Sequence, residues 1–424
     1  MPDPVGQQAP VRGRVAWCFY DWANSAFPTV ITTFVFAAYF TQAVATDEVS
    51  GTAEWGYAVS IAGLAVAVAG PVLGAITDHA GRRKPWLLLF TVLCVIASAA
   101  LWRVTPDPSS VPWALTLVGV AIFAFEMAMV FYNSMLPDLA PAGRLGRWSG
   151  WGWGLGYAGG LACLGVTLIG FVQAETPWFG LDKDTAEHLR ATGPLVALWM
   201  GVFALPLFLV TPDRPSSGVT LAVAIRQGLG TLAATLRRVR DHSQIARFLL
   251  ARMLYTDGLN TLFAFGGIYA AGSFGLTFEE LIVFGIAMNV TAGIGATAFA
   301  WVDDLWGAKR VILISIAALS LLGGALVVVE GKTLFWIFGL PLGIFVGPAQ
   351  SASRSLMARM APSELTTEMF GLYAFSGKAT AFLGPALLAL VTQATGSQRL
   401  GMATILVFFI VGMGLMWKVE DVQN

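Results

Sequence analysis

Long apolar runs recur along the whole of this 424-residue chain and constrain its fold more than any other feature. A helix needs about 20 predominantly apolar residues to cross a bilayer. Twelve runs of this kind lie at residues 15–42, 53–76, 86–104, 112–136, 148–172, 193–211, 245–271, 279–301, 309–329, 333–356, 367–393 and 398–418. Lipid leaves backbone groups without partners, and the runs lack the alternation of barrel strands, so each is predicted to be a helix. The predicted fold class is an all-α polytopic membrane protein with twelve transmembrane helices.

Composition excludes several other classes of protein. Hydrophobic residues make up 56% of the chain and charged residues 12%, which is more apolar surface than a soluble core buries. The 25 Lys and Arg balance the 25 Asp and Glu, so we expect no nucleic-acid partner. The sequence has no ATP-binding loop, so we expect no nucleotide partner. The cysteines and histidines are Cys18, Cys94, Cys163, His79, His188 and His242. Because none are grouped, we expect no disulfide, metal site or cofactor, and no enzymatic activity.

The distribution of positive charge predicts orientation. Nineteen of the 25 Lys and Arg residues fall on the side that includes both termini, five fall in the opposite loops, and Lys378 lies within a span. Positive residues concentrate in cytoplasmic loops. We therefore expect a multi-pass protein of the plasma membrane with both termini cytoplasmic and the first span retained as a permanent helix.

One long hydrophilic stretch, residues 211–242, divides the spans into six and six. The predicted domains are a six-helix half at 1–211, a cytoplasmic linker at 212–244 and a second six-helix half at 245–424. Within the linker, apolar residues recur at near-helical spacing between arginines: Val219, Val223, Leu229, Leu232, Leu236 and Val239, with Arg226, Arg237, Arg238 and Arg240. This pattern predicts an amphipathic helix on an anionic inner leaflet. The alternative is a linker helix with no regulatory task.

Two short patterns occur once in each half. The loop after the second span reads Gly74-Ala-Ile-Thr-Asp78-His-Ala-Gly81-Arg82-Arg83-Lys84, and the loop after the eighth reads Asp304-Leu-Trp-Gly307-Ala-Lys309-Arg310, offset by 226 residues. The first span contains Asp21-Trp-Ala-Asn24-Ser25, and the seventh contains Asp257-Gly-Leu-Asn260-Thr261. Helical spacing of three and four places Asp, Asn and hydroxyl on one face. These repeats indicate an internal duplication.

Twelve helices in two related halves, with Gly-x-x-x-Asp-x-x-Gly-Arg-Arg between spans two and three, resemble the major facilitator superfamily. Several short sequence motifs resemble those of its vacuole-effluxer branch, whose founding members resemble amino-acid exporters of the fungal vacuole. These motifs begin at Tyr20 (YDWANS), Phe131 (FYNSMLPD), Tyr255 (YTDG), Ser353 (SRS), Phe370 (FGLY) and Gly377 (GK). The second-half loop departs from the pattern because Ala300 stands where the first half has Gly74, which puts close helix packing there in question.

Four ionisable residues fall inside predicted spans, where charge is costly unless it is paired or faces water. They are Asp21, Glu126, Asp257 and Lys378. The resemblance implies that spans one, four, seven and ten line a central cavity, which places Asp21, Glu126 and Asp257 toward the substrate and proton path, with Lys378 reaching in from span eleven. Asn24 and Asn260, which share helix faces with Asp21 and Asp257, are predicted to belong to the same path. Charges of both signs suit a zwitterion, and a carboxylate in such a site is a candidate proton carrier, with Glu126 favoured over Asp257. The alternative is a permanent ion pair of Lys378 with one carboxylate.

The repeated loops are predicted to gate the cytoplasmic side. Asp78 can accept hydrogen bonds from the N-terminus of a neighbouring helix, and the basic residues can pair with acidic groups. The predicted gating residues are Gly74, Asp78, Gly81, Arg82, Arg83, Asp304, Gly307, Lys309 and Arg310. The alternative is that the basic run only anchors topology.

Span five contains a literal GxGxxG at Gly154, Gly156 and Gly159. We reject a dinucleotide site, because no strand precedes these glycines and they lie in an apolar span, where small residues let helices approach closely.

Together these features predict a monomeric secondary transporter that works by alternating access, is coupled to protons, and moves small polar solutes, amino acids in first place. The alternatives are a transporter of another cargo, such as a sugar, peptide fragment or drug, and a receptor or lipid scramblase on the same fold.

Overall fold

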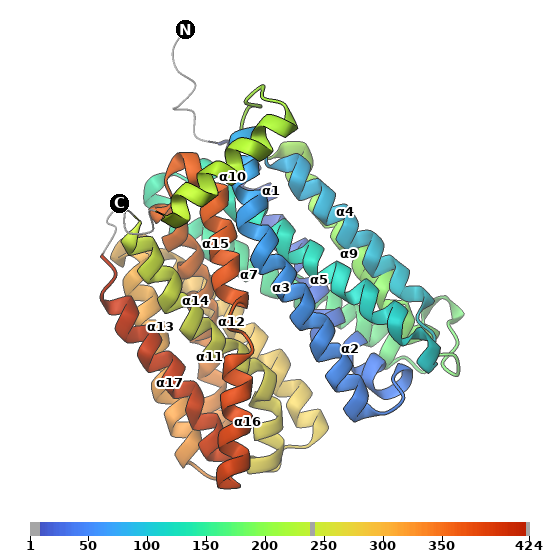
Figure 1. The fold of residues 1–424 in the computed structure, drawn as a ribbon. Coiled ribbons are helices and arrows are strands. Elements are labelled where there is room, and N and C mark those ends of the chain that lie inside the picture. Colours follow the sequence, from blue (N-terminus) through green and yellow to red (C-terminus); the bar gives the residue numbers. More distant parts are fainter. Residues whose placement is uncertain (1–8, 238–241, 421–424) are drawn as a thin grey trace. The chain divides into compact units, whose positions relative to one another are not determined.

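The computed structural model describes residues 9–237 and 242–420 of the chain, and these residues form helices and connecting loops with no strand among them (Figure 1). The first span consists of α1 (Val11–Asn24), a π-helical segment (Phe27–Phe34), α2 (Phe36–Tyr39) and a second π-helical segment (Phe40–Val44). The other long helices are α3 (Glu48–Ala80), α4 (Lys84–Ala100), α5 (Val111–Ser134), α7 (Leu145–Thr167), α9 (Thr192–Val210), α11 (Ser243–Phe274), α12 (Phe278–Trp306), α13 (Ala308–Val328), α14 (Lys332–Met360), α15 (Thr366–Lys378), α16 (Leu383–Thr395) and α17 (Gln398–Trp417). Two short helices are α6 (Leu136–Leu139) and α8 (Glu187–Arg190), and α10 (Leu221–Arg237) lies in the hydrophilic stretch between the sixth and seventh predicted spans.

Eleven segments of the described chain are long and apolar enough to cross a membrane. The one predicted span outside this set is the seventh, at residues 245–271, which corresponds to α11. This helix has 32 residues and so is long enough to cross a membrane, but it is more polar because it carries Asp257 and Asn260. The polytopic all-α prediction is confirmed. The helix with the weakest apolar signal is the one that carries two of the residues predicted for the transport path.

Span eleven, predicted as one run, is divided in the structure. α15 ends at Lys378, and α16 begins at Leu383 with Pro385 in its first turn. Proline lacks the backbone N–H and its ring collides with the preceding turn, so a helix restarts there more easily than it continues. The break places the C-terminus of one helix and the N-terminus of another inside a single span.

Local sequence accounts for several helix ends. Thr277 and Glu280 form a reciprocal cap at the start of α12, in which each side chain accepts from the other's backbone amide at 3.3 and 2.8 Å. Gly275, with φ of +69°, ends α11 in the left-handed conformation that glycine adopts without strain. Lys332 at the start of α14 then pairs with Glu280 at 2.6 Å.

The chain forms two compact units. Unit 1 contains residues 1–69, 81–135 and 155–217, with α4 packed on α5 and α9, and α1 packed on α9. Unit 2 contains residues 70–80, 136–154 and 218–424, with α14 packed on α12 and α13, and α11 packed on α17. The C-terminal end of α3 and the N-terminal end of α7 therefore cluster with helices of the second half of the sequence. Domain boundaries at 211 and 245 stay a prediction.

Glycines allow close helix approach inside each unit. In unit 1, a Cβ on Gly156 would lie 2.7 Å from the Ser25 hydroxyl, and Gly159 lies against the backbone of Trp22. In unit 2, Gly154 lies against Thr297, and Gly70 lies against Gly371. The packing interpretation of the GxGxxG sequence is confirmed.

Gly74 offers a test of this packing. Its Cβ position is 2.5 Å from the Thr367 carbonyl oxygen, whereas Gly119 in α5 has open space around it. We expect Gly74→Ala to destabilise the protein by about 1–3 kcal/mol because two backbones must separate. Gly119→Ala should be neutral or stabilising by about 0.5–1 kcal/mol. Thermal unfolding in detergent measures both, and equal midpoints for the two variants would contradict the close approach.

Candidate functional site

The predicted path residue Asp21 is buried in α1 of unit 1. The Tyr132 hydroxyl of α5 donates to Asp21 Oδ2 at 2.8 Å, and the Tyr132 ring stacks on Trp17 with 4.5 Å between centroids. The neighbouring Tyr20 shares a 2.6 Å hydrogen bond with Thr91 of α4. A neutral phenol therefore orients the Asp21 carboxylate.

Asn24 and Glu126 belong to the same unit. Asn24 is buried, and its amide nitrogen approaches the Met129 sulfur of α5 at 3.3 Å. Glu126 is half-buried on α5, nearly two turns before Tyr132. Unit 1 thus brings Asp21, Asn24 and Glu126 onto two facing helices, α1 and α5.

In unit 2, the counterpart Asp257 is almost completely buried in α11, with 1% of its surface exposed. The backbone amide of Gly384, in the first turn of α16, lies next to its carboxylate. The break in span eleven therefore directs a helix N-terminus, where the dipole favours an anion, toward Asp257. No phenol in the described part of unit 2 bonds to Asp257 as Tyr132 bonds to Asp21.

The two copies of the repeated motif, at Asp21 in α1 and at Asp257 in α11, thus have different surroundings. Thr261 is buried and donates to the Asp257 carbonyl oxygen at 2.8 Å, but Asn260 is exposed, whereas Asn24 is buried. The same helical spacing leaves the Asn of one copy inside a unit and the Asn of the other on a unit's surface.

Lys378 is half-buried at the last residue of α15, the helix end at which a cation is favoured. Nearby, Arg252 of α11 donates to the Tyr373 carbonyl oxygen at 2.6 Å and to the Ser376 hydroxyl at 2.7 Å, and stacks on the Tyr373 ring at 3.4 Å. Sequence analysis missed Arg252 as a site residue. The sequence did contain an indication of this residue, because Arg252 is a charged residue that precedes Asp257 on the same helix within an apolar run.

The Asp78 motif forms a contact between the C-terminal end of α3 and α15. The carboxylate of Asp78 accepts from the backbone amides of Thr367 at 3.0 Å and Glu368 at 2.8 Å, in the first turn of α15. Gly74, one turn earlier, lies against the same backbone. We call these contacts the α3–α15 latch.

Asp304 makes the corresponding contact with α7. It accepts from the backbone amides of Gly146 at 2.8 Å and Arg147 at 3.3 Å in the first turn of α7, and pairs with the Arg147 side chain at 2.9 Å. Each copy of the motif thus uses its Asp to cap the start of a helix from the other half of the sequence. We call this second set the α12–α7 latch.

A buried charged network reinforces the α12–α7 latch. Asp303 pairs with Arg359 at 2.6 Å, and the Ser355 hydroxyl donates to Asp303. Arg354, 1% exposed, donates to the hydroxyl and carbonyl oxygens of Ser149 at 3.0 and 2.6 Å. Buried charges are stable only when they are paired and hydrogen-bonded, and loss of one partner typically costs about 3–5 kcal/mol. Sequence analysis missed the roles of Asp303, Arg147, Arg354 and Arg359, although the doubled Asp303-Asp304 was a visible signal.

The other predicted gating residues take different positions. Gly81 and Gly307 have φ of +91° and +89°, so both loops need glycine at the turn. Asp213 caps the start of α4 by accepting from the backbone amides of Arg83 and Lys84 at 3.1 and 3.0 Å. Arg83 is buried, Arg82 and Arg310 are exposed, and Lys309 is half-buried.

The question raised by Ala300 is resolved by its partner helix. A Cβ on Gly150 of α7 would lie 2.5 Å from the Ala300 methyl group and 2.5 Å from the Ala296 carbonyl oxygen. Close packing is therefore kept, with the small residue moved from α12 to α7.

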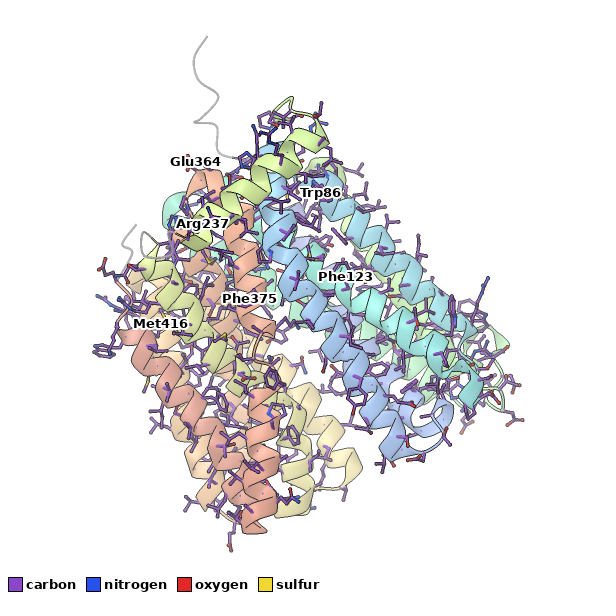
Figure 2. The ribbon with its side chains drawn as sticks, viewed as in Figure 1. Trp86, Phe123, Arg237, Glu364, Phe375 and Met416 are labelled. Carbon is purple, nitrogen blue, oxygen red and sulfur yellow. The ribbon has the colours of Figure 1, made fainter. Side chains whose placement is uncertain are left out.

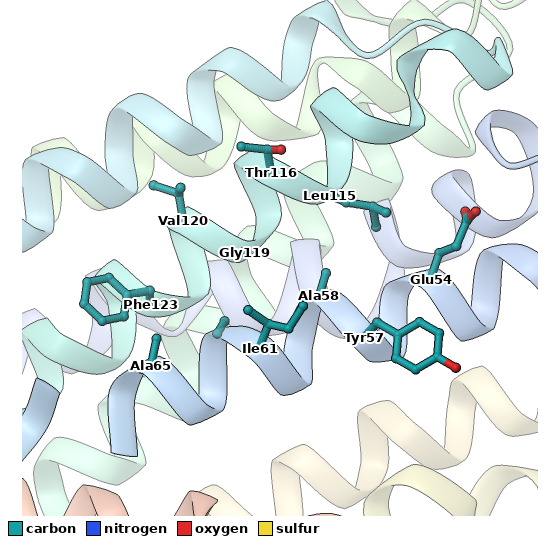
Figure 3. A pocket seen from close by; sticks show the side chains of 11 residues that line it. Glu54, Tyr57, Ala58, Ile61, Ala65, Leu115, Thr116, Gly119, Val120 and Phe123 are labelled. Carbon is teal, nitrogen blue, oxygen red and sulfur yellow. The ribbon is translucent and has the colours of Figure 1, made fainter. Parts of the chain in front are cut away.

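Unit 1 also contains an apolar groove of about 510 Å³ between α3 and α5 (Figure 3). Ala58, Ile61, Ala65 and Phe123 line its length, and Glu54 and Tyr57 lie toward one end. Its chemistry suits an elongated apolar group with a polar end.

Comparison with known proteins agrees with this architecture. A family model described as Vacuole effluxer Atg22 like matches residues 142–423, and one described as Major Facilitator Superfamily matches residues 5–163. The uncharacterized MFS-type transporter YxiO of Bacillus subtilis is 29% identical over 96% of this chain and 94% of its own. Autophagy-related protein 22 of Cryptococcus neoformans is 23% identical over 64% of this chain, which spans 52% of that relative.

The fold itself is that of solved major facilitator proteins. The proton:xylose symporter XylE bound to 6-bromo-6-deoxy-D-glucose superposes with a TM-score of 0.74 over 97% of this chain and 96% of its own, at 14% identity. The human organic anion transporter MFSD10 gives 0.70 over 96% of this chain and 100% of its own, at 16% identity. Helices, paired motifs and matches together define a secondary transporter of the major facilitator superfamily. Within that superfamily, the chain belongs to the vacuole effluxer Atg22-like family.

Proposed function

We propose that this transporter moves small zwitterionic solutes, amino acids in first place, by alternating access coupled to protons. The observation that carries the proposal is the presence of both signs of charge within membrane spans, with Asp21 and Asp257 buried in the two copies of one repeat. Charge at this depth is retained at a cost, so it indicates a site for solute or ion.

The two signs of charge favour a zwitterion over a neutral solute. The ammonium group of an amino acid can replace a cation beside Glu126 or Asp257, and its carboxylate can bind Lys378. A permanent ion pair of Lys378 with one carboxylate is the competing proposal, because such a pair satisfies both charges without a solute. The two proposals differ in whether a bound solute displaces the internal ion pair of Lys378.

Proton coupling follows from the carboxylates. A carboxylate in a low-dielectric site holds a proton more readily than one in water, so solute binding and proton binding can be linked there. Glu126 is the first candidate and Asp257 the second. The structural neighbour XylE is a proton:xylose symporter, which supports coupling of this kind on the same fold.

The two latches are proposed to gate the cytoplasmic side. Both use a carboxylate on helix-terminal amides, a contact that breaks as a unit when the helix moves. We further propose two six-helix halves at 1–211 and 245–424, a monomer, a plasma-membrane location and cytoplasmic termini, in line with the positive-charge distribution.

The experiment that tests the proposed function is uptake into proteoliposomes. A labelled amino-acid mixture is offered with and without an imposed pH gradient, beside labelled xylose as a neutral solute of similar size. We expect accumulation of amino acids only with the gradient. No accumulation by folded protein would remove the amino-acid assignment, and accumulation of xylose alone would support the sugar alternative.

The α3–α5 groove favours an amphipathic cargo as a second candidate. Its apolar lining and the carboxylate of Glu54 fit a cationic amphiphile better than an amino acid. Gradient-driven efflux of a cationic dye, inhibited by filling the groove with Ala58→Phe, would support this candidate.

A further inference from the structure

The linker helix α10 packs on the inner end of α3 in unit 2. Its buried residues are Ala224, Gly228, Leu232 and Thr235. Gly228 lies against the backbone of Ile76, with a Cβ position 2.8 Å from the Ile76 Cα, and Thr231 shares a 2.8 Å hydrogen bond with His79. Ile76 and His79 flank Asp78. The helix therefore covers the segment that carries the α3–α15 latch.

The same helix reaches α15. Thr235 lies beside the buried side chain of Glu368, whose backbone amide donates to Asp78. Anything that holds α10 in place thus also holds both partners of the α3–α15 latch.

A second apolar face of α10 is not covered by the part of the chain that the structure describes. Leu221, Ile225, Leu229 and Leu236 recur on one side of the helix and are 39–58% exposed. Arg226 and Arg237 follow on the adjoining side, and Figure 2 shows Arg237 at the end of α10. The predicted Arg238, Val239 and Arg240 lie outside the described residues.

An apolar cavity of about 240 Å³ opens beside the end of α10, between α10, α11 and α15. Leu236, Ile245, Leu249, Met253, Leu372 and Phe375 contribute to its lining. Leu236 joins the cavity to the exposed apolar face. Arg237 is the next residue along the helix, so a positively charged residue directly follows one that lines the apolar cavity.

We infer that an anionic phospholipid of the inner leaflet binds here, with an acyl chain in the α10–α11–α15 cavity and its phosphate at Arg237, and that this lipid stabilises the α3–α15 latch. Charge complementarity selects an anionic headgroup, since Arg226 and Arg237 are the charged residues of α10 and both are basic. The apolar hollow selects a lipid over a soluble anion. Lipid binding at this site does not depend on the identity of the transported solute.

Hydrogen exchange of residues 221–236 and 366–378 in nanodiscs tests the inference. Phosphatidylcholine discs are compared with discs containing phosphatidylglycerol, and with phosphatidylcholine discs plus inorganic phosphate. We expect about tenfold slower exchange in both segments with phosphatidylglycerol alone, the size of effect that one or two arginines produce near an anionic surface.

Two variants and a matched control sharpen the test. Arg237→Gln removes the charge, and Ala246→Phe fills the cavity, so each should abolish the phosphatidylglycerol effect. Arg12→Gln removes an exposed charge elsewhere on the cytoplasmic side and should leave the effect intact. An equal effect of inorganic phosphate, an equal loss in Arg12→Gln, or wild-type exchange that ignores phosphatidylglycerol would each overturn the inference. Solute uptake is not a readout, so failure here leaves the proposed transport function untouched.

Discussion

Glu126→Gln is expected to abolish gradient-driven accumulation of solute while leaving exchange of solute across the membrane intact. Gln keeps the size and polarity of the side chain but cannot release a proton, so only the coupled step is lost. In proteoliposomes with an imposed pH gradient, the accumulation ratio should fall about tenfold or more, to the level seen without a gradient.

Two further variants help to interpret the result for Glu126→Gln. Asp257→Asn should act like Glu126→Gln if Asp257 is the coupling residue, and should weaken solute binding and exchange if it is a ligand for the solute. Glu48→Gln, which neutralises an exposed carboxylate in the first turn of α3, is the control and should behave as wild type. Equal loss of exchange and accumulation in Glu126→Gln would count against its coupling role.

Asp78→Ala is expected to open the α3–α15 latch. The substitution leaves the amides of Thr367 and Glu368 without their acceptor, which costs about 1–3 kcal/mol for a buried donor. A loss of this size shifts a two-state equilibrium by roughly 5–150-fold toward the open state. A cysteine placed at the buried Met369 in a background without the three native cysteines should be alkylated faster from the cytoplasmic side by a similar factor.

The α12–α7 latch supplies an internal comparison. Asp304→Ala should raise the same labelling rate less than Asp78→Ala, because the buried Asp303–Arg359 pair remains. Asp47→Ala, in an exposed loop where Ser50 hydrogen bonds hold the carboxyl pKa below its usual value, serves as the control and should leave the labelling rate unchanged. Normal transport together with unchanged labelling in Asp78→Ala would refute the gating role.

Much of the fold could be predicted because membrane insertion depends on local composition. The apolar runs indicated the spans, although not the break between Lys378 and Leu383 within span eleven. The importance of the motif glycines could also be predicted, because Gly81 and Gly307 occupy the same turn in both copies of the motif.

The candidate site could be predicted only in part. Asp21, Asp257 and Glu126 stand out because charge is rare in apolar runs. Arg354 does not, since its cost is offset by Ser149, a residue about 200 positions earlier in the chain. The acceptor role of Asp78 could be anticipated from the helix dipole, but the helix it caps could not.

What the sequence by itself determined is which segments are helices that cross the membrane, how the chain repeats, and which side chains are too polar for their surroundings. These are properties of neighbouring residues along the chain. Only the tertiary structure decided that Asp78 caps α15, that Asp304 caps α7, that Gly150 makes room for Ala300, and that α10 covers the latch. The physical reason is that spacing within one helix specifies its faces, while the partner of each face is chosen by packing between helices distant in sequence.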